Sequence, residues 1–430
     1  MSASTGTPGS AYGGPAYRWY VVGILTIIYA CHALDRGLPN ILVEPVKAEF
    51  NLSDSQLGLF SGLAFGVAFS TAVLPMGFLS DRVGNRRNML AIVVVAWSIL
   101  TAVGGMARNF GQLLASRIGM GVAEAGTAPL TMPMLSDIFP PARRAFALGI
   151  FYISQPAGAF VATALGGYIA QEHGWRAAFF VAGVPGLIAA VLLYLTVRDP
   201  KRGGSEGGET AAEKPASLGE AFGQLVRQPA LVWLIAACTI FGLLNITLAA
   251  WMSSFFIRVH HLGLAQTGVI IGAAAGISSV TSPPIFGWLA DKLSTRDPRW
   301  SLRLLWIGAL ATLGLTLCQL YTSSLTIAIT AFVLADMMRM GYAPPAYSVL
   351  MSATPSRMRG SVMSMVQLTT NFMGFAVGPV LTGALSDAFG GGAAIRHAMA
   401  TVSLLFVPAV IFFILASRAL YGPKTAPAAA

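Results

Sequence analysis

The stretch that decides the fold is GFLSDRVGNRR, residues 77–87, because the chain repeats its plan in GWLADKLSTRDPR, residues 287–299. Each copy follows an apolar segment and carries an aspartate, Asp81 or Asp291, four residues after a glycine. About half of the chain's 430 residues separate the two aspartates. PARRAFALGIFYIS at 141–154 and PSRMRGSVMSMVQL at 355–368 repeat in the same way. Such internal similarity predicts two halves in parallel arrangement, a plan typical of one class of transporters.

The composition excludes a water-soluble domain. The chain is 55% hydrophobic and 10% charged, whereas soluble domains carry about 25% charged residues. Apolar runs of about 20 residues, the length needed to cross a bilayer as a helix, recur along the whole chain. The sequence therefore predicts an all-α polytopic membrane protein with two six-helix halves. We expect twelve transmembrane helices, at roughly 18–40, 55–80, 87–108, 110–135, 143–171, 176–197, 229–257, 265–290, 301–322, 325–350, 358–386 and 394–418.

The basic residues predict the orientation. Lysine and arginine concentrate in cytoplasmic loops of membrane proteins, and one set of loops here is far richer in them than the other. We therefore expect both termini on the cytoplasmic side of a bacterial inner membrane, and attribute the net charge of +10 to this bias rather than to nucleic-acid binding. The loop residues concerned are Arg82, Arg86, Arg87, Arg143, Arg144, Lys292, Arg296, Arg299, Arg303, Arg357 and Arg359.

The polar stretches divide the chain. We expect a disordered cytoplasmic N-terminus at 1–17, an N-terminal bundle at 18–197, a cytoplasmic linker at 198–228, a C-terminal bundle at 229–418 and a cytoplasmic tail at 419–430. The linker is rich in Gly, Glu and Lys, and a short amphipathic helix is expected near 217–227. The N-terminus has no basic region typical of a signal peptide, so the first apolar segment is interpreted as an uncleaved helix.

Motifs for cofactor, metal or covalent chemistry are not found in the sequence. The glycine patterns lie within apolar helices rather than after a strand, which excludes a phosphate-binding loop and ATP as the energy source. Cys31, Cys238 and Cys318 lie far apart in apolar runs and are interpreted as small core residues. We expect a monomer that is not an enzyme, with no metal, no catalytic residue, and a proton gradient as its energy source.

These residues resemble the major facilitator superfamily, whose loop motif is matched by Gly77, Asp81, Arg82, Gly84, Arg86 and Arg87. Further motifs resemble its spinster-like branch: Asp35-Arg36, Trp97-Ser98, RIGMGVAEA at 117–125, DIFPPARR at 137–144 and GWRAAFF at 174–180. The resemblance implies a secondary transporter that moves an amphipathic, lipid-like substrate with an anionic or zwitterionic head. A proton-coupled carrier of small organic anions is the alternative, because such carriers share the fourth-helix pattern. A sensor or membrane enzyme is a third, disfavoured by the repeated loop motif.

Six ionisable residues lie well inside the expected helices: Asp35, Arg36, Arg117, Glu124, Asp336 and Arg339. Each costs on the order of 2.5–3.5 kcal/mol at the centre of a membrane helix, so each requires a partner or water. The side chains of Asp35 and Arg36 diverge by about 100° on a helix, so each needs a partner on another helix or water. Asp35 lies at a depth similar to that of Arg117, close enough that these two could pair. Asp336 and Arg339 are three residues apart and are expected to pair within their helix.

The resemblance implies that the first, fourth, seventh and tenth helices line the substrate cavity. We predict that Asp35 and Glu124 are proton-coupling acids, and that Arg36 and Arg117 switch between these acids or bind the substrate's anionic head. Burial disfavours the charged form of an acid, and a nearby guanidinium favours it. Opening of the cavity to either side therefore changes the balance between the protonated and the charged acid. Static ion pairs are the alternative. Asp336, Arg339, Trp251 and Tyr342 are further candidates, with packing the favoured role for the aromatics; packing is also favoured over proton relay for His32.

The loop motif is assigned to conformational gating rather than to substrate binding. Asp81 is expected to face the positive N-terminal end of the eleventh helix, and Arg82 is expected to meet Asp137. The full set assigned to gating is Gly77, Asp81, Arg82, Arg86, Arg87, Asp137 and Asp291.

Overall fold

A computed structural model describes residues 12–200, 223, 228–355 and 358–421 of the chain. Throughout these ranges the secondary structure is helical and contains no strand, so the all-α prediction is confirmed. Most of the predicted N-terminal tail, of the linker with its amphipathic helix, and of the C-terminal tail lies outside the described residues.

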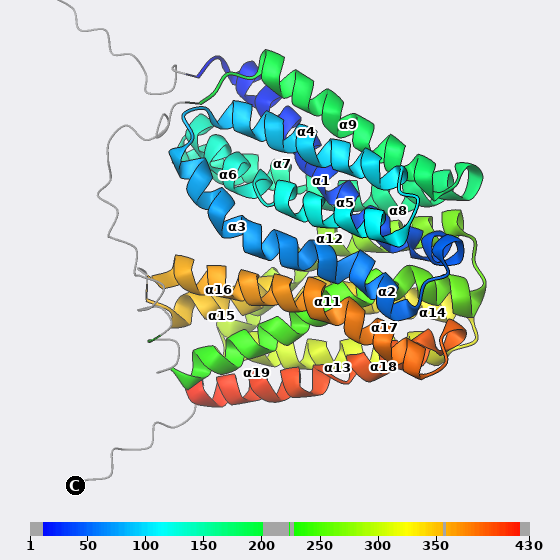
Figure 1. Cartoon of the computed structure of the whole chain (residues 1–430). Helices are drawn as coiled ribbons and strands as arrows, with labels where there is room; N and C mark the ends of the chain where they lie inside the picture. Colours follow the sequence, from blue (N-terminus) through cyan, green and yellow to red (C-terminus); the bar gives the residue numbers. More distant parts are fainter. Residues whose placement is uncertain (1–11, 201–222, 224–227, 356–357, 422–430) are drawn as a thin grey trace, which may run out of the picture. The chain divides into compact units, whose positions relative to one another are not determined.

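The helices of the described residues form two sets along the chain (Figure 1). The first set is α1 (Pro15–Phe50), α2 (Asp54–Gly58), the π-helical turn η1 (Leu59–Leu63), α3 (Ala64–Arg82), α4 (Arg86–Gly105), α5 (Phe110–Glu124), α6 (Thr127–Ile138), α7 (Pro141–Tyr152), α8 (Ser154–His173) and α9 (Trp175–Thr196). The second is α11 (Pro229–His260), α12 (Leu264–Ser294), α13 (Trp300–Tyr321), α14 (Leu325–Met340), α15 (Ala343–Ala353), α16 (Arg359–Asn371), η3 (Phe372–Val377), α17 (Gly378–Ala388), η4 (Gly392–Ala394), α18 (Ile395–Ser403) and α19 (Phe406–Tyr421).

Eleven helical segments among the described residues are long and apolar enough to cross a membrane. The predicted segment that is not among them is the fourth, which carries Arg117 and Glu124 and is divided between α5 and α6. The division has a local cause, because Pro129 has no N–H to bond the carbonyl of Ala125, where α5 gives way to a turn. The GYAPPAY stretch at 341–347 separates α14 from α15 in the same way.

The first helix is longer than predicted. It begins at Pro15, whose fixed φ suits the first helical turn, and it continues to Phe50 instead of ending near residue 40. Asn51 ends it in the left-handed conformation at φ 51°. Ser53 and Gln56 then form a reciprocal capping box that starts α2. The polar residues 44–49 therefore belong to a helix end and not to a loop.

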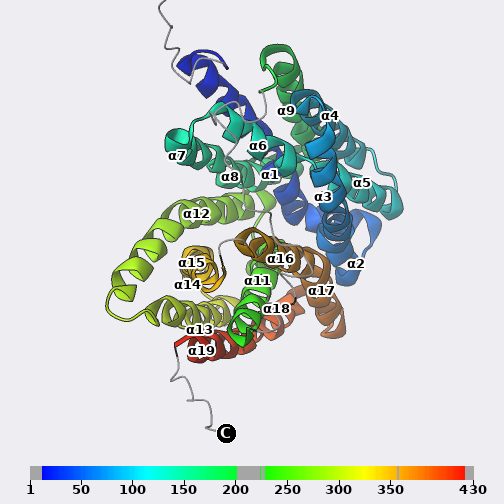
Figure 2. The same cartoon turned by 90° about the vertical axis from the view of Figure 1, so that its left-hand side faces the viewer.

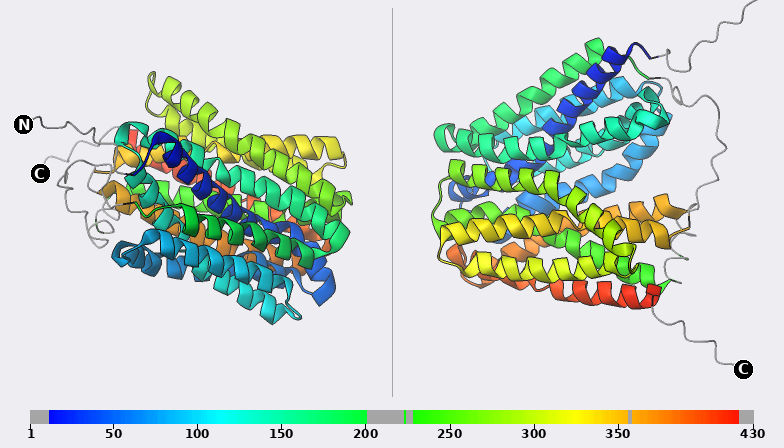
Figure 3. Two further views of the ribbon diagram at one scale, coloured as in Figure 1. Left: turned by 90° about the horizontal axis from the view of Figure 1, so that it is seen from above. Right: turned by 180° about the vertical axis from the view of Figure 1, so that it is seen from behind.

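The chain divides into two compact units. One comprises Met1–Ala211 with Ala249–Gly276, and the other Ala212–Leu248 with Ile277–Ala430. In the first unit α1 packs along α8, and α4 runs beside α9 (Figure 2). In the second unit α13 packs against both α14 and α19 (Figure 3). The predicted bundle boundaries place all of 229–418 together, whereas the contacts group Ala249–Gly276 with the first unit.

The apolar core of the first unit gathers on α1, α4, α6, α7 and α9 and includes the fully buried Trp97 and Phe151. Cys31 and Cys238 are buried as predicted, but Cys318 on α13 is exposed. This correction has a simple reason: in an apolar membrane helix, hydrophobicity does not distinguish the face that packs on protein from the face that meets lipid.

Candidate functional site

A cluster of buried charges lies between α1 and α5 in the first unit. The side chains are those of His32, Asp35 and Arg36 on α1, and Arg117 and Glu124 on α5. His32 is 3% exposed, whereas Asp35, Arg117 and Glu124 are each 1% exposed. Charges at such depth are costly unless they meet partners, and they mark functional sites in membrane proteins. We refer to these five residues as the α1–α5 cluster.

Glu124 is the centre of this cluster. Its Oε2 accepts a hydrogen bond from Nε of Arg36 at 3.0 Å and lies 3.3 Å from Nε2 of His32. Arg36 thus finds its acid on another helix, as the divergence of neighbouring side chains on α1 requires. The other oxygen, Oε1, is buried without a hydrogen-bond partner among the described residues. The carboxylate therefore has unused capacity for a proton or a donor.

Asp35 is buried without an ion pair. Neither of its oxygens has a hydrogen-bond partner in the described part of the chain. Thr101 lies beside it, but the hydroxyl of Thr101 donates its single proton to the carbonyl of Trp97 at 3.0 Å. The pair with Arg117 that the similar depth allows is not formed within 4.0 Å in this structure. Arg117 instead directs Nη1 to the sulfur of Met120 at 3.3 Å.

Aromatic rings on α3 hold the two guanidinium groups. Cζ of Arg36 lies 4.3 Å from the ring centroid of Phe69 and 5.0 Å from that of Phe65. Cζ of Arg117 lies 5.1 Å from the same Phe65 ring. Cation–π contacts strengthen when desolvated, so both arginines are stabilised without an acid for each. Phe65 and Phe69 were not among the candidate residues predicted from the sequence. They are four residues apart and therefore share a helix face.

A glycine brings the two sides of the site together. A Cβ atom at Gly121 would lie 2.7 Å from the carbonyl oxygen of Phe65 and 2.9 Å from Cβ of Ala68. Only glycine permits that approach of α5 to α3. Since Arg117 and Glu124 flank Gly121 on α5, the RIGMGVAEA motif has a physical explanation: its glycine sets the distance between the charges and the Phe65 ring.

Four further candidates are Asp336, Arg339, Tyr342 and Trp251. Asp336 and Arg339, both buried, form the predicted ion pair within α14. Tyr342 stacks on Phe241, with ring centroids 4.5 Å apart. Trp251, on the part of α11 that belongs to the first unit, is fully buried. Buried aromatic packing agrees with the structural role favoured for Tyr342 and Trp251, while a substrate role for these four residues stays a prediction.

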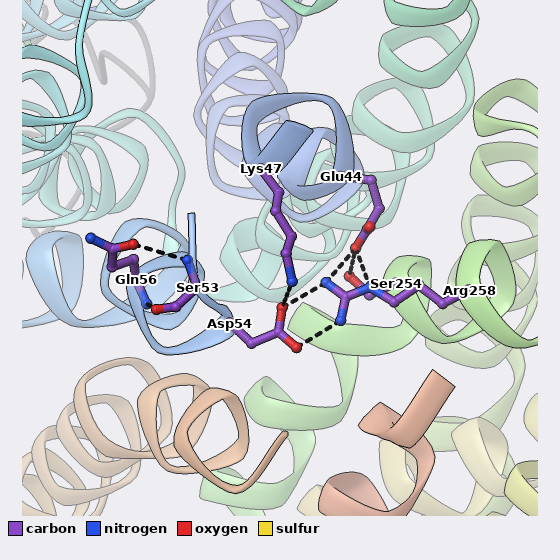
Figure 4. Close-up of polar contacts among 7 residues, drawn as sticks. All are labelled: Glu44, Lys47, Ser53, Asp54, Gln56, Ser254 and Arg258. Carbon is purple, nitrogen blue, oxygen red and sulfur yellow. Dashed lines mark hydrogen bonds and ion pairs between the residues drawn. The ribbon is translucent and has the colours of Figure 1, made fainter. Parts of the chain in front are cut away.

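A second charged cluster joins α1, α2 and α11, and the sequence analysis missed it (Figure 4). Arg258 donates two hydrogen bonds to Asp54, at 2.7 and 2.8 Å, and one to Glu44 at 2.9 Å. Lys47 also pairs with Asp54, and Ser254 donates to Glu44 at 2.5 Å. We call these five residues the Arg258 cluster. The signal was hidden because α1 was expected to end near residue 40, before Glu44 and Lys47.

The GWRAAFF motif also serves packing at a helix end. Nε1 of Trp175 donates to Glu49 at 2.6 Å, and Nη1 of Arg176 donates to the same oxygen at 2.5 Å. Nη2 of Arg176 donates to the carbonyl of Ala107 at 2.9 Å. The motif therefore ties the start of α9 to the end of α1 and to the turn after α4.

Most of the residues assigned to gating from the sequence lie near the ends of helices. Asp137 near the end of α6 accepts from Arg86 at 2.7 Å, in place of the expected Arg82, which is exposed at the end of α3. Arg87 donates its backbone N–H to Asp199 at 2.9 Å. The correction reflects geometry: Arg86 opens α4 after the turn. Gly77 lies on α3 and Asp291 is exposed near the end of α12, while the side chain of Asp81 lies outside the described residues.

Comparison with known proteins identifies the family. Residues 25–373 match the model of the Major Facilitator Superfamily. The chain belongs to this superfamily. It is 30% identical over 392 residues to an MFS-type efflux pump of Mycolicibacterium smegmatis, covering 87% of this chain and 86% of that protein. It is also 25% identical to Protein spinster of Drosophila melanogaster over 382 residues, covering 86% of this chain and 62% of that protein.

The solved structures agree with the motif analysis. A bacterial homolog of the human lysosomal transporter Spinster, in an inward-facing and unoccupied conformation, matches with a TM-score of 0.86 and 27% identity. The match covers 97% of this chain and 100% of that one. The chain is therefore a spinster-like, multi-pass transporter of the superfamily, a family of membrane transporters rather than enzymes, and the predicted fold and family are confirmed.

Proposed function

We propose that the protein is a secondary active transporter that moves an amphipathic, lipid-like substrate of lysolipid or sphingoid type by alternating access, coupled to protons. The observation that carries the proposal is the α1–α5 cluster. Two buried acids face two arginines there, and only one of the acids is paired.

The arrangement favours exchange of partners. Arg36 is bound to Glu124 while Asp35 has no ion pair, so a change in the position of one guanidinium alters which acid is stabilised as a carboxylate. An uncompensated buried carboxylate is costly and takes up a proton more readily. Coupling requires this dependence of protonation on conformation, and we assign it to Asp35 and Glu124.

The substrate class is inferred from chemistry and from relatives. Arginine forks suit carboxylate or phosphate heads, and the rings of Phe65 and Phe69 would be compatible with apolar groups nearby. A protein of Arabidopsis thaliana described as a probable sphingolipid transporter is 32% identical over 157 residues, 36% of this chain. Both facts support an anionic or zwitterionic head on an apolar tail.

A small organic anion is the second candidate. A probable L-galactonate transporter of Escherichia coli is 25% identical over 389 residues, covering 86% of this chain and 84% of that protein. The same two arginines would bind such a carboxylate. The choice between the candidates therefore depends on whether an apolar tail contributes to binding.

The direct test is a thermal-shift screen of the purified protein against lysophospholipids, sphingoid lipids and short carboxylates. Stabilisation by the lipids, with RT ln(1 + [L]/Kd) as the expected dependence, supports the main proposal. A response to carboxylates alone overturns it in favour of the second candidate. Detergent-matched lysolipid analogues without a charged head serve as the control.

We further propose that the protein works as a monomer in a bacterial inner membrane with both termini in the cytoplasm, and that the loop motif with Asp81 sets its conformational balance. The excess of basic residues in one set of loops supports this orientation. Labelling of a cysteine introduced at Ser205 should fail with an impermeant reagent added outside intact cells. Efficient labelling would reverse the orientation.

A further inference from the structure

His32 shares the carboxylate of Glu124 with Arg36, and the transport cycle proposed above gives it no role. Its Nε2 lies 3.3 Å from Oε2 of Glu124. Its other nitrogen, Nδ1, is buried and has no hydrogen-bond partner within the described ranges of the chain. A carboxylate oxygen is an acceptor only, so a neutral imidazole at this distance is assigned its proton on Nε2. His32 therefore directs its N–H-bearing nitrogen at the carboxylate of Glu124.

The imidazole is held in one place. It stacks on the ring of Tyr29, with centroids 5.0 Å apart and an angle of 22° between the planes. Tyr29 in turn packs on Phe151 at 4.6 Å. Ala30 lies two residues before His32 on α1. A Cβ atom at Gly158 of α8 would lie 2.1 Å from the carbonyl oxygen of Ala30, so α8 packs directly against this turn of α1. The donor cannot move away without disturbing this packing.

Arg36 differs from His32 in this respect. Its side chain is 22% exposed. It is long and flexible, and its guanidinium can change position while it stays in contact with the rings of Phe65 and Phe69. Transfer of its guanidinium to an anionic head would remove the stronger donor from a buried carboxylate. A buried acceptor that loses its donor is destabilised, so a second donor that stays would stabilise the Glu124 carboxylate during the exchange.

We infer that His32 is the positioning residue that keeps Oε2 of Glu124 hydrogen-bonded while Arg36 exchanges between Glu124 and the head group of the substrate. This inference rests on the function proposed above. The charged or titratable groups that act on Glu124 are Asp35 and Arg36 on α1 and Arg117 on its own helix, with Tyr29 beyond the imidazole. The role belongs to the N–H group of His32 and does not require that its ring change charge.

The experiment measures the protonation of Glu124 itself. Infrared difference spectra of the purified protein in liposomes are recorded while the pH is stepped, and the carboxylic-acid band that disappears in Glu124→Gln is assigned to this residue. His32→Leu removes the donor; His32→Gln keeps an N–H donor that does not titrate. In His32→Leu the band should persist to a pH about one unit higher, because the carboxylate has lost a hydrogen bond. His32→Gln should restore the wild-type midpoint.

The outcomes separate the inference from the proposed function. A wild-type band that does not titrate at any pH overturns the coupling role of Glu124 and the inference with it. A titrating band with the same midpoint in wild type and His32→Leu overturns the inference alone. A His32→Gln protein that behaves like His32→Leu also overturns it, since titration of the ring would then matter. Should His32→Leu aggregate, His32→Asn replaces it, because the shorter amide does not reach Glu124.

Discussion

Replacement of Arg258 by glutamine tests the Arg258 cluster. Arg258 is 8% exposed in its side chain and donates three charge-assisted hydrogen bonds to two acids. Asp54 is completely buried, so loss of the fork takes two donors from its carboxylate, while the ion pair with Lys47 stays. Removing one member of a buried pair costs about 3–5 kcal/mol. Because Lys47 remains, we expect about 3 kcal/mol.

The assay is thermal unfolding in a fixed detergent at a fixed scan rate. At about 2 °C per kcal/mol for a unit of this size, Arg258→Gln should lower the apparent Tm by roughly 6 °C. Arg176→Gln is the matched control. It breaks an ion pair whose partners are 37% and 40% exposed, and exposed pairs contribute about 0–1 kcal/mol. The reasoning is refuted if both variants unfold within about 1 °C of each other.

Three further predictions concern the α1–α5 cluster and the loop motif. Gly121→Val places side-chain atoms against the carbonyl of Phe65, so uptake should be lost and Tm should report a destabilisation of about 1–3 kcal/mol. Gly77→Val, on the open face of α3, is the control and should fold normally. Arg117→Lys should impair uptake severely while size-exclusion profiles stay monodisperse, because an ammonium lacks the planar fork; wild-type uptake would exclude such a role. Asp81→Asn removes the charge proposed to face the N-terminal end of the eleventh helix, an interaction typically worth about 0.3–1 kcal/mol, and should shift spin-label distances towards the inward-open state; an unchanged distribution would argue against gating.

The membrane fold was predictable because long apolar segments and a repeated loop motif are plain in the sequence. Charges inside apolar helices are costly and therefore conspicuous, which is why Asp35, Arg36, Arg117 and Glu124 were all identified from the sequence. The repeated loop motif likewise predicted two halves, and the family match agrees with it.

The partners of these residues were not predictable. Pairing between helices depends on their rotation and separation, which are set by contacts such as Gly121 against Phe65 and do not appear in the pattern of charges. Similar depth thus allowed a pair between Asp35 and Arg117, whereas the structure pairs Arg36 with Glu124. The Arg258 cluster was missed for a different reason: hydropathy fails at a polar helix end, so the last turns of α1 looked like a loop.

Proton coupling through Asp35 and Glu124 is the central claim, and gradient-driven uptake into proteoliposomes tests it most directly. Lysophosphatidylglycerol and a short carboxylate serve as probes, and the one that the wild type accumulates under a pH gradient is used for the variants. Asp35→Asn and Glu124→Gln should each abolish accumulation, while exchange without a gradient continues and shows that each variant is folded and binds the probe. Full gradient-driven accumulation by Asp35→Asn would contradict the coupling role and leave a structural ion-pair network in its place.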